Sequence, residues 1–222
     1  MASIGYRIHP SPARCARELL EAFRPVVTSH LGDCMGRLYG AVGLRPYHRT
    51  GKLVGTAFTV KTRPGDNLLV HEALDRAAPG DVVVVDGGGD VTNAIVGELM
   101  GMHARQRGLA GFVVDGAIRD VGWYDDFPCY ARGHVHRGPY KDGPGEINVP
   151  VCVGGMVVLP GDIIVGDDDG LLAIRPADAP ELLELARKKA ADEQRTKSAI
   201  AEGRLDRSWV REALSARGAA VS

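Results

Sequence analysis

Long apolar runs alternate with amphipathic segments in the middle of this chain. The runs are almost free of polar residues, which is typical of strands buried on both faces of a sheet. The segments between them have apolar residues at helical spacing, as amphipathic helices do. The runs are residues 52–62, 81–90 and 111–116, and the segments are residues 66–81 and 96–111. This order of strand, helix, strand, helix and strand predicts two βαβ units around a parallel sheet.

The sequence beyond residue 128 has a different pattern. Short apolar runs are punctuated there by glycine, proline and aspartate, which predicts hairpins or a compact β-layer. These runs are residues 127–133, 149–158, 161–169 and 170–175. The "GDDDG" stretch at 166–170 could be a calcium loop, but the pattern favours a hairpin turn, since Asp and Gly suit tight turns.

Further helices are predicted on both sides of this region. The first spans residues 9–24, with Ser11 as its cap and Pro12 in its first turn. The others are predicted at residues 28–40, 177–203 and 207–216. We expect one α/β domain over residues 1–222, with a mixed and partly parallel sheet. Its core covers about residues 28–175, and a C-terminal helical arm covers about residues 176–222.

Composition narrows the class of protein. Of the 222 residues, 45% are hydrophobic and only 5% aromatic, so we expect an aliphatic core. The formal net charge of −1 argues against a nucleic-acid or membrane partner, because phosphate binding usually needs a basic surface. The four cysteines lie far apart, without a CxxC pair. With no signal-peptide pattern and no run long enough to cross a bilayer, we expect a cytoplasmic protein with reduced thiols.

A site that binds a ligand is predicted at the carboxyl ends of two neighbouring strands. One strand leads into "DGGGDVTNAIVGELM" and the next into "DGAIRD". If the strands are adjacent, Gly97–Met100 and the Arg119–Asp120 pair line one crevice. A helix start at Gly97 and the guanidinium of Arg119 would both bind a small carboxylate. Asp120 and Glu98 are hard oxygen ligands that suit Mg²⁺ or Mn²⁺.

Each of these residues also has an ordinary structural explanation. An Arg–Asp pair after a strand is commonly a solvated ion pair, and Glu98 could simply complement the helix dipole. Arg119 and Asp120 can face the same crevice only if their strand has already ended, and Gly116 offers a place for that. Lys141 is not expected to act as a Schiff-base nucleophile, because it lies in a Gly/Pro-rich loop without a visible apolar pocket.

Most of the chain resembles one known protein family. The stretch "GDVVVVDGGGDVTNAIVGELMGMHARQRGLAGFVVDGAIRDV", followed later by "NVPVCVGGMVVLPGDIIVGDDDG", resembles the class II 4-hydroxy-4-methyl-2-oxoglutarate / 4-carboxy-4-hydroxy-2-oxoadipate aldolases. That family also includes the regulator of ribonuclease activity A. The resemblance extends from about Gly32 to Ile174. It implies a swivelling α/β/β/α fold, assembled as a homotrimer or a hexamer.

The resemblance also implies a role for individual residues. The helix-start amides and the arginine would bind pyruvate, with Asn67 nearby; these positions are Gly97, Glu98, Leu99, Met100 and Arg119. Asp120 would hold a divalent cation, Mg²⁺ or Mn²⁺, and Glu98 would bond a metal-bound water. A catalytic glutamate would come from the C-terminal helix of a neighbouring subunit. Glu193 is the best match for it, and Glu202 stays open as an alternative.

The expected activity follows from that assignment. We expect retro-aldol cleavage of a 4-hydroxy-2-oxo diacid to pyruvate and a 2-oxo acid, with oxaloacetate decarboxylation as a side activity through the same enolate. The alternative is a non-catalytic regulatory binding protein. The segment from His134 to Pro150, "HVHRGPYKDGPGEINVP", departs from the aldolase pattern and could contact the distal part of the substrate. The physiological substrate, the metal used and the choice between trimer and hexamer stay open.

Overall fold

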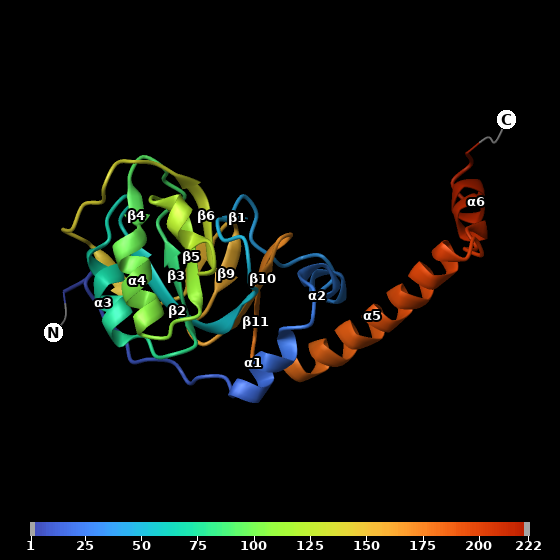
Figure 1. Cartoon of the computed structure of the whole chain (residues 1–222), viewed down its shortest axis with the longest axis horizontal. Helices are drawn as coiled ribbons and strands as arrows, with labels where there is room; N and C mark the ends of the chain where they lie inside the picture. Colours follow the sequence, from blue (N-terminus) through green and yellow to red (C-terminus); the bar gives the residue numbers. More distant parts are fainter. Residues whose placement is uncertain (1–2, 220–222) are drawn as a thin grey trace.

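The computed structural model describes residues 3–219, and its main feature is a mixed sheet. The path through this sheet is β1-β6-β5-β3-β2-β10-β11, while β4 pairs with β5 and β7 with β2 (Figure 1). A separate hairpin is formed by β8 and β9. The strands are β1 (Arg45–Pro46), β2 (Leu53–Thr62), β3 (Asp81–Asp86), β4 (Ala94–Val96), β5 (Gly111–Ile118), β6 (Cys129–His134), β7 (Gly145–Ile147), β8 (Val151–Val153), β9 (Met156–Val158), β10 (Ile163–Asp167) and β11 (Gly170–Ile174).

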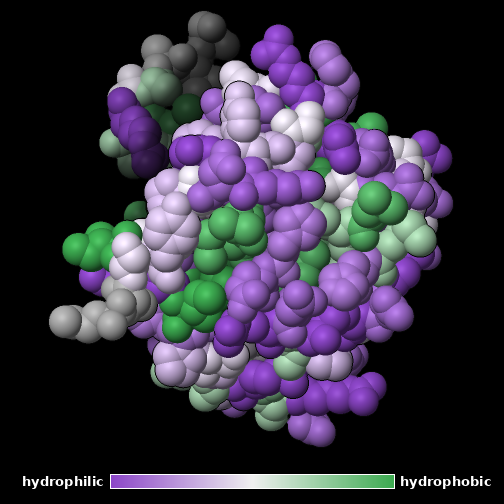
Figure 2. Space-filling view, turned by 90° about the vertical axis from the view of Figure 1, so that its left-hand side faces the viewer, coloured by the Kyte–Doolittle hydropathy of each residue, from purple (hydrophilic) through white to green (hydrophobic). Residues whose placement is uncertain are grey.

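Helices cover the sheet and extend from it. They are α1 (Arg17–Phe23), α2 (Thr28–Cys34), α3 (Leu68–Arg76), α4 (Glu98–Gln106), the 3₁₀ turn η1 (Val121–Tyr124), α5 (Ala179–Ala201) and α6 (Ser208–Ser215). No helix among residues 3–219 has the length and hydropathy needed to cross a bilayer. The face in Figure 2 is largely hydrophilic, with hydrophobic residues gathered in separate patches.

The two predicted βαβ units are confirmed. Strands β2, β3 and β5 lie side by side and run parallel, with α3 and α4 as the crossover helices. Every residue of β3 and β5 is buried, which explains why their sequences are continuous apolar runs rather than alternating ones. Because β7 and β10 pair with β2 in the antiparallel direction, the sheet is mixed, as predicted.

The layers follow from three apolar clusters. One face of the sheet packs against α3 and α4, where Phe58 and Val85 meet Leu69 and Met100. The opposite face packs against the β8–β9 hairpin. Helices α1, α2 and the first turns of α5 pack against β10 and β11. This α/β/β/α arrangement confirms the predicted fold class, and the hairpin at 166–170 is confirmed by the β10–β11 pairing.

The first helix is shorter than predicted, and its predicted cap is wrong. Helix α1 begins at Arg17, preceded by Ala16 in an extended conformation, so Ser11 and Pro12 lie outside it. Residues 9–16 are irregular and are held by distant parts of the chain: the side-chain amide of Asn148 donates to the carbonyls of His9 and Pro10, and Nε of Arg14 donates to Asp81 at 3.1 Å.

Candidate functional site

The strand ends that were predicted to be neighbours are neighbours. Strand β4 pairs in parallel with the end of β5, with Val96 beside Ile118. The backbone N–H of Arg119 donates a hydrogen bond of 3.0 Å to the carbonyl of Val96. Gly97 therefore begins α4 directly beside Arg119, at the carboxyl end of the parallel sheet.

Asp120 shares this crevice because of its backbone conformation. Strand β5 ends at Ile118, so it has ended before Arg119 and Asp120, as predicted, although the end lies two residues beyond Gly116, where it was expected. Asp120 also adopts a left-handed conformation, with φ 55° and ψ 42°, which Asp tolerates better than most residues. The alternation of side chains along a strand thus does not apply to this pair. Arg119 and Asp120 therefore lie on the same side.

The carboxylate of Asp120 turns toward the start of α4. Its Oδ2 accepts a hydrogen bond of 3.1 Å from the backbone N–H of Glu98 and lies 3.5 Å from Nε of Arg119. A Cβ atom added to Gly97 would lie 2.6 Å from that oxygen and 2.9 Å from Cγ of Arg119. Only glycine allows the helix start, the guanidinium and the carboxylate to approach so closely.

A small cavity opens beside this contact. Its volume is about 110 Å³, and its lining comes from α3, from the turn between β4 and α4, from the end of β5 and from the segment after β6. The lining residues are Asn67, His71, Ile95, Val96, Gly97, Leu99, Met100, Arg119, Pro139 and Lys141. Five of the residues predicted for substrate binding therefore line one cavity. The side chain of the sixth, Glu98, is exposed at the helix start.

Asn67 has an unpaired acceptor inside the site. Its side chain is 2% exposed, and its Nδ2 donates to the carbonyl of Ile95 at 2.9 Å. Because this bond fixes the orientation of the amide, Oδ1 is the other end, and it has no partner among residues 3–219. A buried acceptor without a partner is costly, so a donor on a ligand or water would stabilise it.

Burial sets the charge of two groups near the cavity. Burial raises the pKa of the Tyr124 phenol, and the neighbouring Cys129 and Asp120 add to the effect, so this hydroxyl stays neutral. Partial burial also lowers the pKa of His71, and the nearby ammonium of Lys141 lowers it further. At neutral pH His71 is therefore a neutral imidazole, and the side chains of Arg119 and Lys141 supply the positive charge of the lining.

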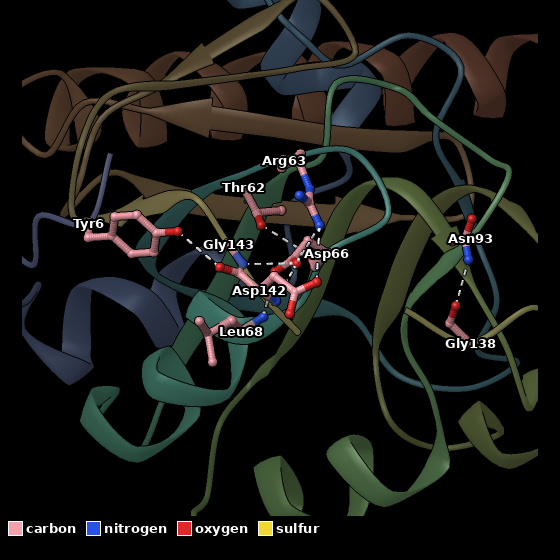
Figure 3. A network of polar contacts seen from close by, with 9 residues as sticks. All are labelled: Tyr6, Thr62, Arg63, Asp66, Leu68, Asn93, Gly138, Asp142 and Gly143. Carbon is pink, nitrogen blue, oxygen red and sulfur yellow. Dashed lines mark hydrogen bonds and ion pairs between the residues drawn. The ribbon is translucent and has the colours of Figure 1, made fainter. Parts of the chain in front are cut away.

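The sequence interpretation missed how the segment after β6 reaches the site. Figure 3 shows the fully buried carboxylate of Asp66 at the centre of a polar network. It accepts backbone hydrogen bonds from Leu68 at 2.9 Å, from Asp142 at 2.8 Å and from Gly143 at 3.0 Å. The guanidinium of Arg63 lies 3.2 Å from the same carboxylate. This network fixes the loop that carries Lys141 against the start of α3.

The donor set at Asp120 suits a hard divalent cation. Its Oδ2 is shared between Glu98 and Arg119, while its Oδ1 has no hydrogen bond within residues 3–219. The same part of the chain contains no group of three His, Cys, Asp or Glu side chains placed to hold a metal. A single carboxylate fits an ion such as Mg²⁺, which retains most of its waters, better than it fits Zn²⁺.

The two glutamates predicted to complete a neighbour's site lie on the arm. Glu193 of α5 pairs with His30 of α2 and lies 3.2 Å from Lys197. His30 and then Lys197 lower the pKa of Glu193. Glu202 follows α5 and pairs with Arg204. Neither glutamate lines the cavity of its own chain, and a contribution to another subunit stays a prediction.

Comparison with known proteins gives a consistent picture. Residues 26–173 match the family described as RraA-like, Aldolase/RraA. The chain is 39% identical over 188 residues to a Halalkalibacterium halodurans protein named "Putative 4-hydroxy-4-methyl-2-oxoglutarate aldolase", covering 83% of this chain and 90% of that relative. A crystal structure from Pseudomonas syringae pv. tomato is similar with a TM-score of 0.78 and 26% identity, over 88% of this chain and 94% of the other. Streptomyces coelicolor RraAS2, described as an unusual member of the RNase ES inhibitor RraA family, is similar with a TM-score of 0.76 and 26% identity, over 84% and 98%.

Proposed function

Because this chain belongs to the RraA-like, Aldolase/RraA family, we propose that it is a divalent-metal-dependent pyruvate aldolase. Its substrate would be a 4-hydroxy-2-oxo diacid, cleaved to pyruvate and a second 2-oxo acid. The observation that carries the proposal is the left-handed conformation of Asp120, which places its carboxylate against Arg119 and the start of α4, beside the cavity that Arg119 and Gly97 line. A surface ion pair would not need this conformation or the glycine at position 97.

The 2-oxo acid half of the substrate would bind at the start of α4. The first N–H groups of a helix have no partner within it, and those of Leu99 and Met100 are available for the substrate carboxylate. Arg119 would hold the same carboxylate with two parallel hydrogen bonds. The unpaired Oδ1 of Asn67 would accept a hydrogen bond from a hydroxyl group or a water.

Each residue of the site would then have its own role in the cleavage reaction. A divalent cation held by Asp120 would polarise the keto oxygen of the substrate. Glu98, through a water molecule, would take the proton from the 4-hydroxyl as the C3–C4 bond breaks. The electron pair of that bond passes to an enolate of pyruvate, whose charge Arg119 stabilises. Return of a proton to C3 gives pyruvate.

Oxaloacetate decarboxylation would use the same site. Loss of carbon dioxide from oxaloacetate leaves the same enolate, but no hydroxyl proton has to be removed. We therefore propose this reaction as a side activity that depends on Arg119 and Asp120 and less on Glu98. We also propose that the active form is a trimer or a hexamer, in which Glu193 of the arm completes the site of a neighbour.

A coupled assay of pyruvate release tests the proposal. The purified protein should form pyruvate from oxaloacetate and from a 4-hydroxy-2-oxo diacid when Mg²⁺ or Mn²⁺ is present. EDTA should abolish both reactions, and added Mg²⁺ should restore them. Asp120→Ala should be inactive with both substrates at any Mg²⁺ concentration. Full activity of this variant in EDTA would refute the metal-dependent reaction.

The second candidate function is regulation of another protein. It is favoured by the similarity to RraAS2, which is described as belonging to a family of ribonuclease inhibitors. A regulator would act through its surface and would not need an intact cavity. Absence of pyruvate formation from either substrate with saturating Mg²⁺ would favour this function over the aldolase.

A further inference from the structure

A second cationic group lies at the cavity besides Arg119. Lys141 lines it from the loop after β6, and His71 lines it from α3. We propose that Lys141, assisted by His71, binds a second carboxylate of the substrate and so selects dianionic 2-oxo acids over monoanionic ones. This inference rests on the proposed function for the placement of the 2-oxo acid end of the substrate at Arg119.

The backbone on both sides of Lys141 is fixed. Before it, Tyr140 donates to the carbonyl of Gly65 at 2.9 Å and accepts from the N–H of Asn67 at 3.0 Å. After it, the N–H groups of Asp142 and Gly143 both donate to the buried carboxylate of Asp66 (Figure 3). The side chains of Tyr140, Lys141 and Asp142 are exposed, but hydrogen bonds hold the backbone on both sides of Lys141. The contacts hold the base of the Lys141 side chain at the rim of the cavity.

A second set of contacts attaches the same loop to the Arg119 side of the site. The side-chain amide of Asn93 donates to the carbonyl of Gly138 at 2.6 Å, as Figure 3 shows. A Cβ atom added to Gly138 would lie 3.3 Å from a terminal nitrogen of Arg119. The loop therefore passes close to the Arg119 guanidinium before it reaches Lys141. Both cations are positioned by the same short segment.

The ammonium of Lys141 is available for a ligand. Among residues 3–219, no acidic side chain lies within 4 Å of it. The nearby acids have other partners, since Asp142 lies 3.8 Å from Arg63 and Asp75 lies 3.1 Å from His103. His71 is uncharged at neutral pH and can donate one N–H without adding a second charge. One ammonium and one neutral donor match a single carboxylate.

The size of the cavity limits the ligand further. A volume of about 110 Å³ is on the scale of a short acid rather than of a nucleotide. Its buried acceptor, Oδ1 of Asn67, suits a hydroxyl group on the same ligand. A short diacid that carries a hydroxyl between its two ends has the groups that the lining can bind.

Two matched substrates distinguish the binding of the second carboxylate from the cleavage reaction. The diacid 4-hydroxy-2-oxopentanedioate and the monoacid 4-hydroxy-2-oxopentanoate share the reacting atoms and differ by a carboxylate in place of a methyl group. The wild type should favour the diacid in kcat/KM. Lys141→Met, which keeps the length of the side chain, should lower this preference by ~10-fold or more, chiefly through KM for the diacid, because a hydrogen bond to a charged group is lost.

Arg17→Met is the matched control. Arg17 lies on α1, is exposed, and has no ion pair within residues 3–219, so its removal changes the net charge equally without touching the cavity. It should leave the preference unchanged. His71→Gln keeps a donor and should reduce the preference less than Lys141→Met does. An unchanged preference in Lys141→Met would overturn the proposed subsite.

Equilibrium binding tests the subsite without turnover. Calorimetry with Mg²⁺ present would compare 2-oxopentanedioate with 2-oxopentanoate, which again differ by one carboxylate. The wild type should bind the diacid at least ~10-fold more tightly, and Lys141→Met should lose that difference. Equal affinity for the two acids, or no binding of either, overturns the subsite. Selective binding of the diacid without any cleavage would instead refute the proposed aldolase and support the subsite.

Discussion

The cavity and the C-terminal arm are built in opposite ways. The cavity is open on one side and lined by residues of one chain, and buried groups such as Asp66 and Asn67 fix its lining. The arm is attached by the first turns of α5, where Leu182, Leu183 and Ala186 are buried. Beyond these turns α5 projects away from the sheet and carries α6 at its far end (Figure 1).

The arm leaves apolar side chains uncovered that the core would bury. Ile200 is 56% exposed, Trp209 64% and Leu214 45%, and α6 has no buried residue. A short helix without packing partners is only marginally stable in water. The difference between the regions indicates that one chain forms the lining of the cavity, whereas the arm needs another surface. A second copy of this chain is the surface that we predict.

The largest effect is expected from a change inside the cavity. Arg119→Lys keeps the charge but loses the planar fork that binds a carboxylate at two points. We expect a normally folded protein with unchanged oligomeric state and at least ~10²-fold less pyruvate formation, because one preorganised donor to an enolate is lost. The measurement is kcat and KM for oxaloacetate and for the diacid at saturating Mg²⁺.

The same experiment can refute the proposal that Arg119 binds the substrate in the cavity. An exposed ion pair contributes roughly 0–1 kcal/mol and does not depend on the guanidinium shape. If wild type is active and Arg119→Lys matches it within a few-fold on both substrates, Arg119 does not bind the substrate. Arg49→Lys, on an exposed loop away from the cavity, serves as a control for the substitution itself.

The next effect concerns the arm and whether it acts on another subunit. Glu193→Ala should lower turnover by about 10-fold or more if this carboxylate assists proton transfer at a neighbour's site. Mixing Glu193→Ala with Asp120→Ala subunits should partly restore pyruvate formation, because each hybrid then contains one intact shared site. The mixed protein is compared with each variant alone. An active monomer in light scattering would contradict the shared site.

A smaller effect is expected from the buried network behind the cavity. Asp66→Asn keeps the size of the side chain but replaces one acceptor oxygen by a donor that faces N–H groups. We expect the free energy of unfolding to fall by about 2–4 kcal/mol, since hydrogen bonds to a buried carboxylate are lost. Thermal unfolding measures it, at roughly 2–4 °C per kcal/mol for a chain of this size. Asp168→Asn, in the exposed turn between β10 and β11 and without a side-chain hydrogen bond or ion pair within residues 3–219, should leave Tm unchanged.

The smallest effect is a pH dependence of the attachment of the arm. His30 and Lys197 hold the pKa of Glu193 below its ordinary 4.5, and Lys189 holds the pKa of Asp33 below 3.8. A carboxylate with a lowered pKa contributes stability above its ordinary pKa and loses it as the pH falls through the lowered value. The Tm difference between wild type and Asp33→Asn/Glu193→Gln should therefore be largest above the ordinary pKa of 4.5, shrink as the pH falls below it, and disappear only below the lowered pKa values. A constant difference would show that these pairs do not hold α5 to α2.

Much of the fold was predictable because its signals are local. The buried strands 53–62 and 81–86 are continuous apolar runs, and α4 begins beside the glycine expected to start it. The start of α1 was predicted wrongly because Asn148 and Asp81, both distant in the sequence, bind residues 9, 10 and 14. The roles proposed for Gly97, Arg119 and Asp120 remain predictions, although the structure brings these residues together.

The sequence by itself determined the alternation of buried strands and amphipathic helices, and it placed an arginine, two acids and a glycine at strand ends. These features depend on local propensity and hydrophobic periodicity, which neighbouring residues encode. Only the tertiary structure decided that Asp120 turns back toward Glu98 and that Lys141 reaches the cavity. Both depend on contacts between distant residues, such as Asp66 with Asp142, which are 76 positions apart. Such contacts form only when the whole sheet is packed, because each is stabilised by burial that no local segment provides.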